Sequence, residues 1–361
     1  MACKKWILIT FCIGCFFSSN AQKFVNEFLN IGVGARAHGM SGSVTASVDD
    51  GTAGYWNPSG LIHVKSDLQI NAMHANWFGG IANYDYVSIV KKMSGEQNHV
   101  AAFSFIRLGV DNIPNTLSLI GPDGTIDYDR VTNFSAADFA GIFSYARAVG
   151  MNQKLSLGGS VKVIHRSIGS FGKAWGFGAD LSVLYKVTPS LTLGVAGKDI
   201  TTTFNAWSFN LTDDEKKVFQ STDNDIPVSS TELTLPRLVL GIAYKIHNGN
   251  FSYLGELDAN ISTYGYKAAV ISTNRFNIDP SFGLEIGYAN KVFVRGGVGN
   301  LQSVINPVNT AQRKFELQPN VGLGLKLGRL KVDYALANVG SVSGVLVSHI
   351  FSLGLDFIVK E

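Results

Sequence analysis

Residues 155–166 read LSLGGSVKVIHR, and the two sets of alternate positions differ in chemistry. The odd positions are apolar apart from one glycine: Leu155, Leu157, Gly159, Val161 and Val163. The even positions are polar or very small: Ser156, Gly158, Ser160 and Lys162. Successive side chains of a strand point to opposite faces, so this pattern predicts a strand with one apolar face. The alternation returns in residues 177–186, 238–246, 321–327, 330–336 and 351–357.

The strands of a water-soluble β-sandwich also alternate between apolar and polar residues. Segment length and the placement of aromatic residues therefore decide between a soluble protein and a membrane protein. The alternating segments run to about 10–14 residues, whereas strands of soluble proteins have about 5–6. A tilted transmembrane strand needs roughly 9–11 residues. Aromatic residues gather at the segment ends, as in the interfacial girdles of membrane barrels; they include Trp77, Tyr86, Tyr145, Trp175, Tyr253 and Tyr288. These features predict strands that cross a membrane.

The pattern predicts strands at 66–77, 80–91, 98–109, 136–148, 154–167, 173–187, 190–199, 234–246, 250–263, 279–289, 291–300, 316–327, 329–340 and 346–358. Short turns alternate with long loops at 110–134, 200–233, 264–278 and 301–315. Strands in lipid must form a closed ring, because no backbone group finds water there. The predicted fold is therefore an all-β, antiparallel transmembrane barrel of about 14 strands. Outer-membrane barrels carry their long loops outside and their short turns in the periplasm.

Residues 1–21 have the features of a secretory signal peptide. Lys4 and Lys5 precede a 12-residue apolar run, and small residues lead to Gln22. Lipidation at Cys15 is the alternative. All three cysteines of the chain lie in this segment, so residues 22–361 offer no disulfide and no thiol site. The expected location is the Gram-negative outer membrane, with the termini periplasmic or in the lumen.

Residues 22–65 do not follow the strand pattern and are rich in Gly and Ala, whereas 66–361 form the predicted barrel. Asp49 or Asp50 is a candidate helix cap, and Pro58 would end that helix. We predict that this segment lies inside the barrel as a plug; a loose terminal tail is the alternative. Its glycines would let the backbone lie close to the wall.

The motifs Ile31-Gly-Val-Gly-Ala-Arg36-Ala with Gly39, and Tyr55-Trp-Asn-Pro-Ser-Gly60-Leu, resemble the PorV/PorQ family of outer-membrane proteins. The ending Phe351-Ser-Leu-Gly-Leu355 is also similar to theirs, and the Asn-Pro dipeptide resembles the FadL channels. The resemblance implies a FadL-like barrel with an N-terminal hatch. It also implies the type IX secretion system of Bacteroidota, in which such proteins bind cargo or translocon partners. The hatch residues that carry it are Gly32, Gly34, Ala35, Arg36, Gly39, Asn57, Pro58 and Gly60.

Two functions follow: docking of secretion machinery or secreted cargo, and, as the alternative, a FadL-like passive channel for hydrophobic small molecules. A purely structural barrel is a third reading. The predicted lumen carries charges of both signs, which favours docking over an oily conduit. Arg36 is a candidate to pair with a lumenal carboxylate such as Asp180 or Glu285; a solvated arginine in the lumen is the alternative.

Thr212 and Glu215 form a capping box, which predicts a short helix through Phe219 in the loop 200–233. Its acidic residues Asp213, Asp214 and Glu215 are a candidate outer contact surface, although such a charged run is most often a solvated face.

The sequence lacks the residues needed for nucleic-acid binding, calcium binding or catalysis. The 30 basic and 27 acidic residues give a net charge of +3, which is too low for nucleic-acid binding. The acidic run at 123–129 lacks the glycine and distal Glu of an EF-hand. The histidines are scattered, and no nucleophile elbow occurs. The sequence therefore predicts that the protein is not an enzyme and has no cofactor and no metal site. The expected binding partners are outer-membrane lipid and the secretion or cargo proteins named above.

Overall fold

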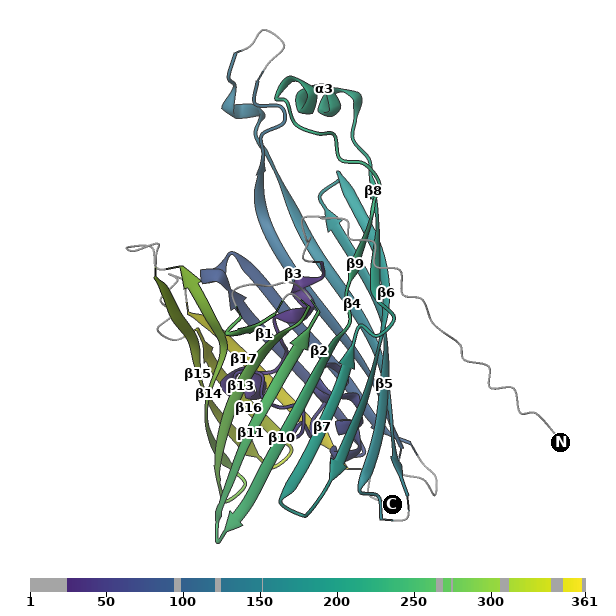
Figure 1. The fold of residues 1–361 in the computed structure, drawn as a ribbon. Coiled ribbons are helices and arrows are strands. Elements are labelled where there is room, and N and C mark those ends of the chain that lie inside the picture. The colour runs from purple at the N-terminus through teal and green to yellow at the C-terminus, as the bar shows by residue number, and fades with distance from the viewer. Residues whose placement is uncertain are drawn as a thin grey trace, which may run out of the picture.

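The computed structural model describes residues 25–93, 99–120, 125–150, 152–263, 269–273, 275–305, 312–338 and 347–358. The predicted signal peptide at 1–21 lies outside these residues. Fourteen strands form one ring, in the order β1-β2-β3-β4-β5-β6-β7-β10-β11-β13-β14-β15-β16-β17. Every neighbouring pair is antiparallel, and β1 closes the ring on β17 through partners such as Leu68 and Phe357. The predicted fold class is confirmed (Figure 1).

The strands of the ring have these bounds: β1 Leu68–Trp77, β2 Ala82–Lys92, β3 His99–Asn115, β4 Thr132–Val149, β5 Leu155–Ile168, β6 Gly172–Lys186, β7 Leu191–Lys198, β10 Arg237–Asn248, β11 Phe251–Ser262, β13 Asn277–Tyr288, β14 Val292–Ile305, β15 Arg313–Leu327, β16 Leu330–Ala337 and β17 Ser348–Phe357. Each corresponds to one predicted segment. The main differences are at the long loops, where β3, β4, β14 and β15 continue beyond the predicted bounds. A register shift between Val110 and Ile113 marks the extension of β3.

The two faces of the wall follow the alternation in the sequence. Val161 is 57% exposed on the outer face, whereas its neighbour Lys162 is 5% exposed and points inward. Near the long-loop end, Phe139, His165 and Trp175 form an aromatic row on the outer face, with ring centroids 6.3 and 4.4 Å apart. This arrangement is typical of a membrane barrel, whose apolar band ends at aromatic rows.

The loop 200–233 contains more structure than the single helix predicted for it. β8 (Thr203–Phe209) pairs with β6, and β9 (Thr231–Thr234) pairs with β8, so the wall continues above the ring on this side. Between them α3 (Asp213–Ser221) begins with the predicted capping box at Thr212 and Glu215 and ends two residues beyond Phe219. A two-residue strand, β12 (Ile271–Ser272), pairs with β13 in the next long loop.

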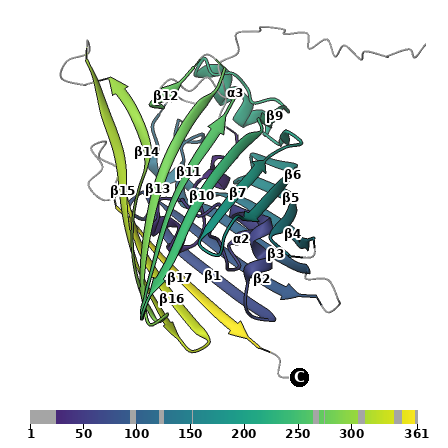
Figure 2. The same cartoon turned by 60° about the horizontal axis from the view of Figure 1, so that its bottom comes forward.

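The segment Val25–Val64, called the hatch below, lies inside the ring (Figure 2). It contains η1 (Glu27–Asn30), α1 (Ala35–Gly39), α2 (Ala53–Trp56) and η2 (Pro58–His63). The N-cap of α2 is Thr52; the Asp50 carboxylate accepts a hydrogen bond from the Thr52 amide at 2.9 Å. Pro58 follows α2 as predicted, but it also starts η2. Two further turns are η3 (Phe78–Gly80) and η4 (Tyr128–Arg130). No helix in the described part of the chain has the length and hydropathy needed to cross a membrane.

Candidate functional site: the hatch and the cavity above it

Arg36 lies at the centre of a buried chain of charges between hatch and wall. Its Nε donates to Glu285 Oε2 at 2.9 Å, and Arg295 Nε donates to the same oxygen at 2.7 Å. Arg295 Nη1 also donates to Asp333 at 2.6 Å. Of the two carboxylates named from the sequence, Glu285 is therefore the partner. Asp180 instead accepts from Lys162 Nζ at 2.8 Å and lies in a separate cluster.

The electrostatics keep Arg36 charged. Burial alone would lower the pKa of its guanidinium, but attraction to Glu285 and to Asp49 and Asp50 outweighs burial, so the pKa lies above its usual value. Burial likewise works against the charged form of Asp50, yet Lys331 and Arg36 hold the pKa of that carboxyl below its usual value. Both groups therefore remain ionised, and the hatch is bound to the wall by charge–charge contacts.

A second contact uses the hatch backbone. Asp258 Oδ2 accepts hydrogen bonds from the amides of Val44 and Thr45 at 3.2 and 3.1 Å. Glu256 Oε1 accepts from the amide of Ala46 at 2.5 Å. Both acids are buried on the lumenal side of β11. Because their partners are main-chain groups, no side-chain pattern in the hatch could have indicated this contact.

The residues of the Asn-Pro motif hold the two arms of the hatch together. Asn57 Nδ2 donates to Thr45 O at 2.6 Å, and its Oδ1 accepts from the amide and the hydroxyl of Ser59. Pro58 occupies the first turn of η2. A Cβ atom on Gly60 would lie 2.6 Å from the carbonyl oxygen of Val48, so only glycine fits there.

The glycines of the first motif have related roles. Gly32 and Gly34 have φ angles of 96° and 89°, a region that favours glycine. The amide of Gly34 donates to Met73 Sδ at 3.0 Å, and the amide of Ala35 donates to Ser352 Oγ at 2.8 Å. A Cβ atom on Gly39 would lie 3.0 Å from the Cα atom of Gly322 in the wall. The motif residues are thus the points where the hatch backbone turns sharply or touches the barrel.

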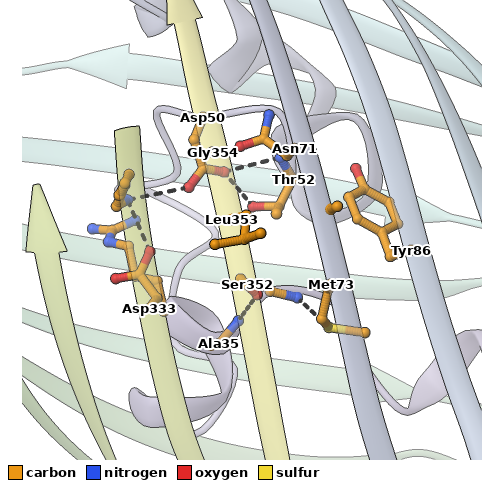
Figure 3. A pocket seen from close by; sticks show the side chains of 14 residues that line it. Ala35, Asp50, Thr52, Asn71, Met73, Tyr86, Asp333, Ser352, Leu353 and Gly354 are labelled. Atoms are coloured by element: carbon orange, nitrogen blue, oxygen red, sulfur yellow. Dashed lines mark hydrogen bonds and ion pairs between the residues drawn. The ribbon is translucent and has the colours of Figure 1, made fainter. Parts of the chain in front are cut away.

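A small pocket of about 20 Å³ remains between the hatch and strands β1, β16 and β17. Figure 3 shows Asp50 and Thr52 of the hatch beside Asn71 of the wall, with Ala35 beside Ser352. Lys331 Nζ lies 3.6 Å from Asp50 and 3.7 Å from Asp333. This volume holds about one water molecule and is too small for an organic ligand.

A much larger cavity, of about 780 Å³, lies on the other side of the hatch. Its wall residues include Arg237, Ser262, Asn277, Asn300 and Gln318, which lie near the strand ends that adjoin the long loops. The cavity therefore occupies the long-loop end of the lumen, above the hatch. Pockets that bind small molecules commonly have volumes of about 300–1,000 Å³.

Aromatic side chains of the hatch and of β1 line the base of this cavity: Tyr55, Trp56 and Trp77. Tyr55 OH donates to Leu29 O at 2.5 Å, and Trp56 Nε1 donates to Val33 O at 2.8 Å, so both rings are fixed. Burial raises the pKa of Tyr55 to about 12, which keeps its hydroxyl protonated as a donor. His38 is buried beside them, and burial lowers its pKa to about 4, so its ring is neutral near pH 7. The cavity thus has a rigid aromatic base.

The barrel wall contributes a polar part of the lining. Its side-chain groups include amides and carboxylates, among them Asp258, Asn260, Asp279, Asn320 and Asn338. Two cationic side chains, Lys198 and Arg237, lie at another part of the lining. The cavity therefore offers both apolar ring contacts and hydrogen-bonding groups to a small molecule.

The acidic residues proposed as an outer contact lie on α3, away from the hatch (Figure 1). Asp213 and Asp214 pair with Lys216 and Lys217 within the helix at 3.0 and 2.9 Å. Both carboxylates are almost fully exposed. Their role as a contact surface remains a prediction. Within the described residues, no three His, Cys, Asp or Glu side chains come together as a metal site.

No protein-family model matches the chain, and no curated protein matches it in sequence. Solved structures match it in fold. The Pseudomonas putida toluene transporter TodX has a TM-score of 0.56 at 14% identity, over 91% of this chain and 99% of that one. The monoaromatic hydrocarbon channel CymD has 0.54 at 16%, over 92% and 99%. The Ralstonia pickettii toluene transporter TbuX has 0.51 at 15%, over 90% and 98%. The chain therefore has the fold of the FadL-like outer-membrane barrels: a closed ring of fourteen antiparallel strands.

Proposed function

We propose that this protein is an outer-membrane channel that admits small, largely hydrophobic molecules through the cavity above its hatch. The observation that carries the proposal is the cavity of about 780 Å³ with an aromatic base, inside a closed barrel. Three solved structures of similar fold are named as toluene transporters or a monoaromatic hydrocarbon channel, which supports the same function. Those proteins are named as transporters and a channel, and we propose no catalytic activity for this protein.

In this proposal the long loops face the cell exterior, so that the cavity receives molecules from outside. The aromatic rings of the hatch hold the apolar part of the ligand, and the hatch is the constriction that the ligand must pass. The ion pairs of Arg36 and the backbone contacts of Asp258 keep the constriction closed at rest.

Uptake of a labelled aromatic compound by cells that express the protein tests this function. Val239 lines the cavity, whereas Leu238 points to the outer face of the same strand. Val239→Trp should reduce uptake several-fold by filling the cavity, and Leu238→Trp should leave uptake unchanged. Wild-type uptake no higher than that of cells without the protein would refute the channel.

A second candidate is docking of secreted proteins or of type IX secretion machinery, as the PorV/PorQ resemblance implies. One observation favours it: the described part of the loop that joins the extended ends of β3 and β4 stands above the ring (Figure 1), and it carries the exposed side chains of Ile120, Ile126 and Tyr128. We rank the channel first, because the similar folds belong to named transporters. Affinity purification from outer membranes tests docking, and the loss of a recovered secretion protein after Tyr128→Asp would support it.

A further inference from the structure

Two cationic side chains in the cavity face each other across neighbouring strands. Lys198 ends β7, Arg237 begins β10, and the two residues are directly opposed in the antiparallel register. Like charges at opposed positions are unfavourable. Lys198 is only 6% exposed, and both residues line the cavity. The fold thus concentrates positive charge at one place in the lining.

Within the described residues, neither side chain has a carboxylate within ion-pair distance. The nearest acids are engaged elsewhere, because Asp180 and Asp199 both accept from Lys162 Nζ. Lys198 Nζ lies 4.3 Å from the ring centroid of Tyr55 and 5.2 Å from that of Trp56. These cation–π contacts stabilise the charge on one side. They satisfy none of the ammonium's three hydrogen-bond donors.

Three other buried cations of this lumen are paired with carboxylates. Arg36, Arg295 and Lys162 each contact a carboxylate at 2.9 Å or less. Lys198 and Arg237 have no such contact within the described residues, and both line the cavity of about 780 Å³. A buried charge without a partner is costly, so an anionic group brought by a ligand would stabilise the charged forms of these two side chains.

We propose that the cavity binds a small ring-bearing anion, such as an aromatic carboxylate, with its charged group between Lys198 and Arg237. This inference rests on the proposed channel function and specifies its ligand. The ring lies against Tyr55 and Trp56, the two aromatic side chains beside Lys198. Asp258 and Asp279 line another part of the cavity and repel a carboxylate there, so the ligand has one orientation.

The test compares 3-phenylpropionate with its neutral isostere 3-phenylpropionamide, near neutral pH, by calorimetric titration of the full chain in lipid nanodiscs. Wild type should bind the anion at least about tenfold more tightly, because a hydrogen bond to a charged group is stronger than one to a neutral group. Lys198→Met keeps the length of the side chain and should abolish this preference. Lys198→Arg should retain it.

Lys173→Met is the matched control, because Lys173 is exposed and lies outside the cavity lining. It should leave both affinities unchanged. Without ligand, Lys198→Met should also unfold at a higher temperature than wild type, since it removes an unpaired buried charge. A higher unfolding temperature would show that Lys198→Met is folded, so that its loss of anion preference comes from the missing ligand contact.

The outcomes distinguish this inference from the channel function. Binding of the amide as tightly as the anion by wild type would overturn the anion site and leave the channel standing. An anion preference that persists in Lys198→Met would also overturn it. Absence of binding and of cellular uptake for both compounds would overturn the inference and the channel together.

Discussion

A Cβ atom on Gly158 would lie 2.2 Å from the amide nitrogen of Ser59. Gly158 belongs to β5 of the wall and Ser59 to η2 of the hatch, so the two backbones are in contact at this point. The same amide donates to Ser182 Oγ at 2.9 Å. The wall is therefore shaped to the hatch as well as to the membrane.

Gly158→Val should displace η2 and reduce the free energy of unfolding by about 1–3 kcal/mol, the usual cost of overpacking. Gly296→Val is the matched control, because a Cβ atom at Gly296 meets no atom within 4 Å. Urea titration followed by tryptophan fluorescence measures both. Equal effects of the two substitutions would show that the hatch does not press on β5.

Glu285→Gln should be more destabilising than Arg36→Met. The first substitution leaves two buried guanidinium groups, those of Arg36 and Arg295, without their shared carboxylate. The second leaves Glu285 paired with Arg295. Breaking a buried pair costs about 3–5 kcal/mol, and we expect Glu285→Gln to reach this range while Arg36→Met stays below it. Thermal unfolding of both variants tests the order, and the reverse order would contradict the shared-carboxylate arrangement.

Val161→Arg should impair barrel assembly, whereas Ile126→Arg should not. The two side chains are similarly exposed, at 57% and 61%, but Val161 lies in the apolar band and Ile126 in a long loop. Arginine near the middle of the membrane costs about 2–4 kcal/mol, and in water it costs almost nothing. Heat-modifiable gel mobility reports the folded barrel. A similar loss of folded barrel in both variants would show that the membrane boundary is assigned wrongly.

Acidification should loosen the hatch between about pH 6.5 and pH 4. Burial lowers the pKa of His38 to about 4; burial, assisted by Lys186, does the same for His63. Below pH 6.5, about the pKa of an unfolded histidine, the two histidines bind protons in the unfolded hatch but remain neutral in the folded hatch. The stability of the folded hatch therefore falls as the pH falls. Hydrogen–deuterium exchange of residues 25–64 should therefore accelerate over this range, after correction for intrinsic rates.

The matched control for this pH effect is the double variant His38→Gln, His63→Gln. Its hatch should exchange at a rate that changes much less over the same range. A wild-type hatch with constant protection from pH 7 to pH 4 would contradict the role of the two histidines.

The direction of the barrel can be tested with single cysteines, because residues 22–361 contain none. With the long loops outside, Asp214→Cys on α3 should react with an impermeant maleimide on intact cells. Asn248→Cys, at the short turn after β10, should react only after the membrane is opened. Labelling of Asn248→Cys alone on intact cells would reverse the proposed orientation.

The ring could be predicted from the sequence because its cause is local. Each strand carries its own apolar outer face and polar inner face, as in Val161 and Lys162, and lipid requires the ring to close. β8 and β9 were missed because they are short and extend the wall beyond the apolar band. The partners of the hatch depend on which strands meet it inside the ring. Glu285 and Asp180 are equivalent in sequence, and only the closed barrel places Glu285 beside Arg36.

The bond from the amide of Ala35 to Ser352 Oγ joins residues 317 positions apart. The hatch precedes every strand along the chain, yet its partner lies in β17, the last strand of the ring. During synthesis the hatch is therefore made before every strand that holds it, and this particular bond can form only after β17 has been made. The contacts of the hatch with β5, β11 and β13 need only earlier strands, whereas the bond to Ser352 depends on the strand that closes the ring.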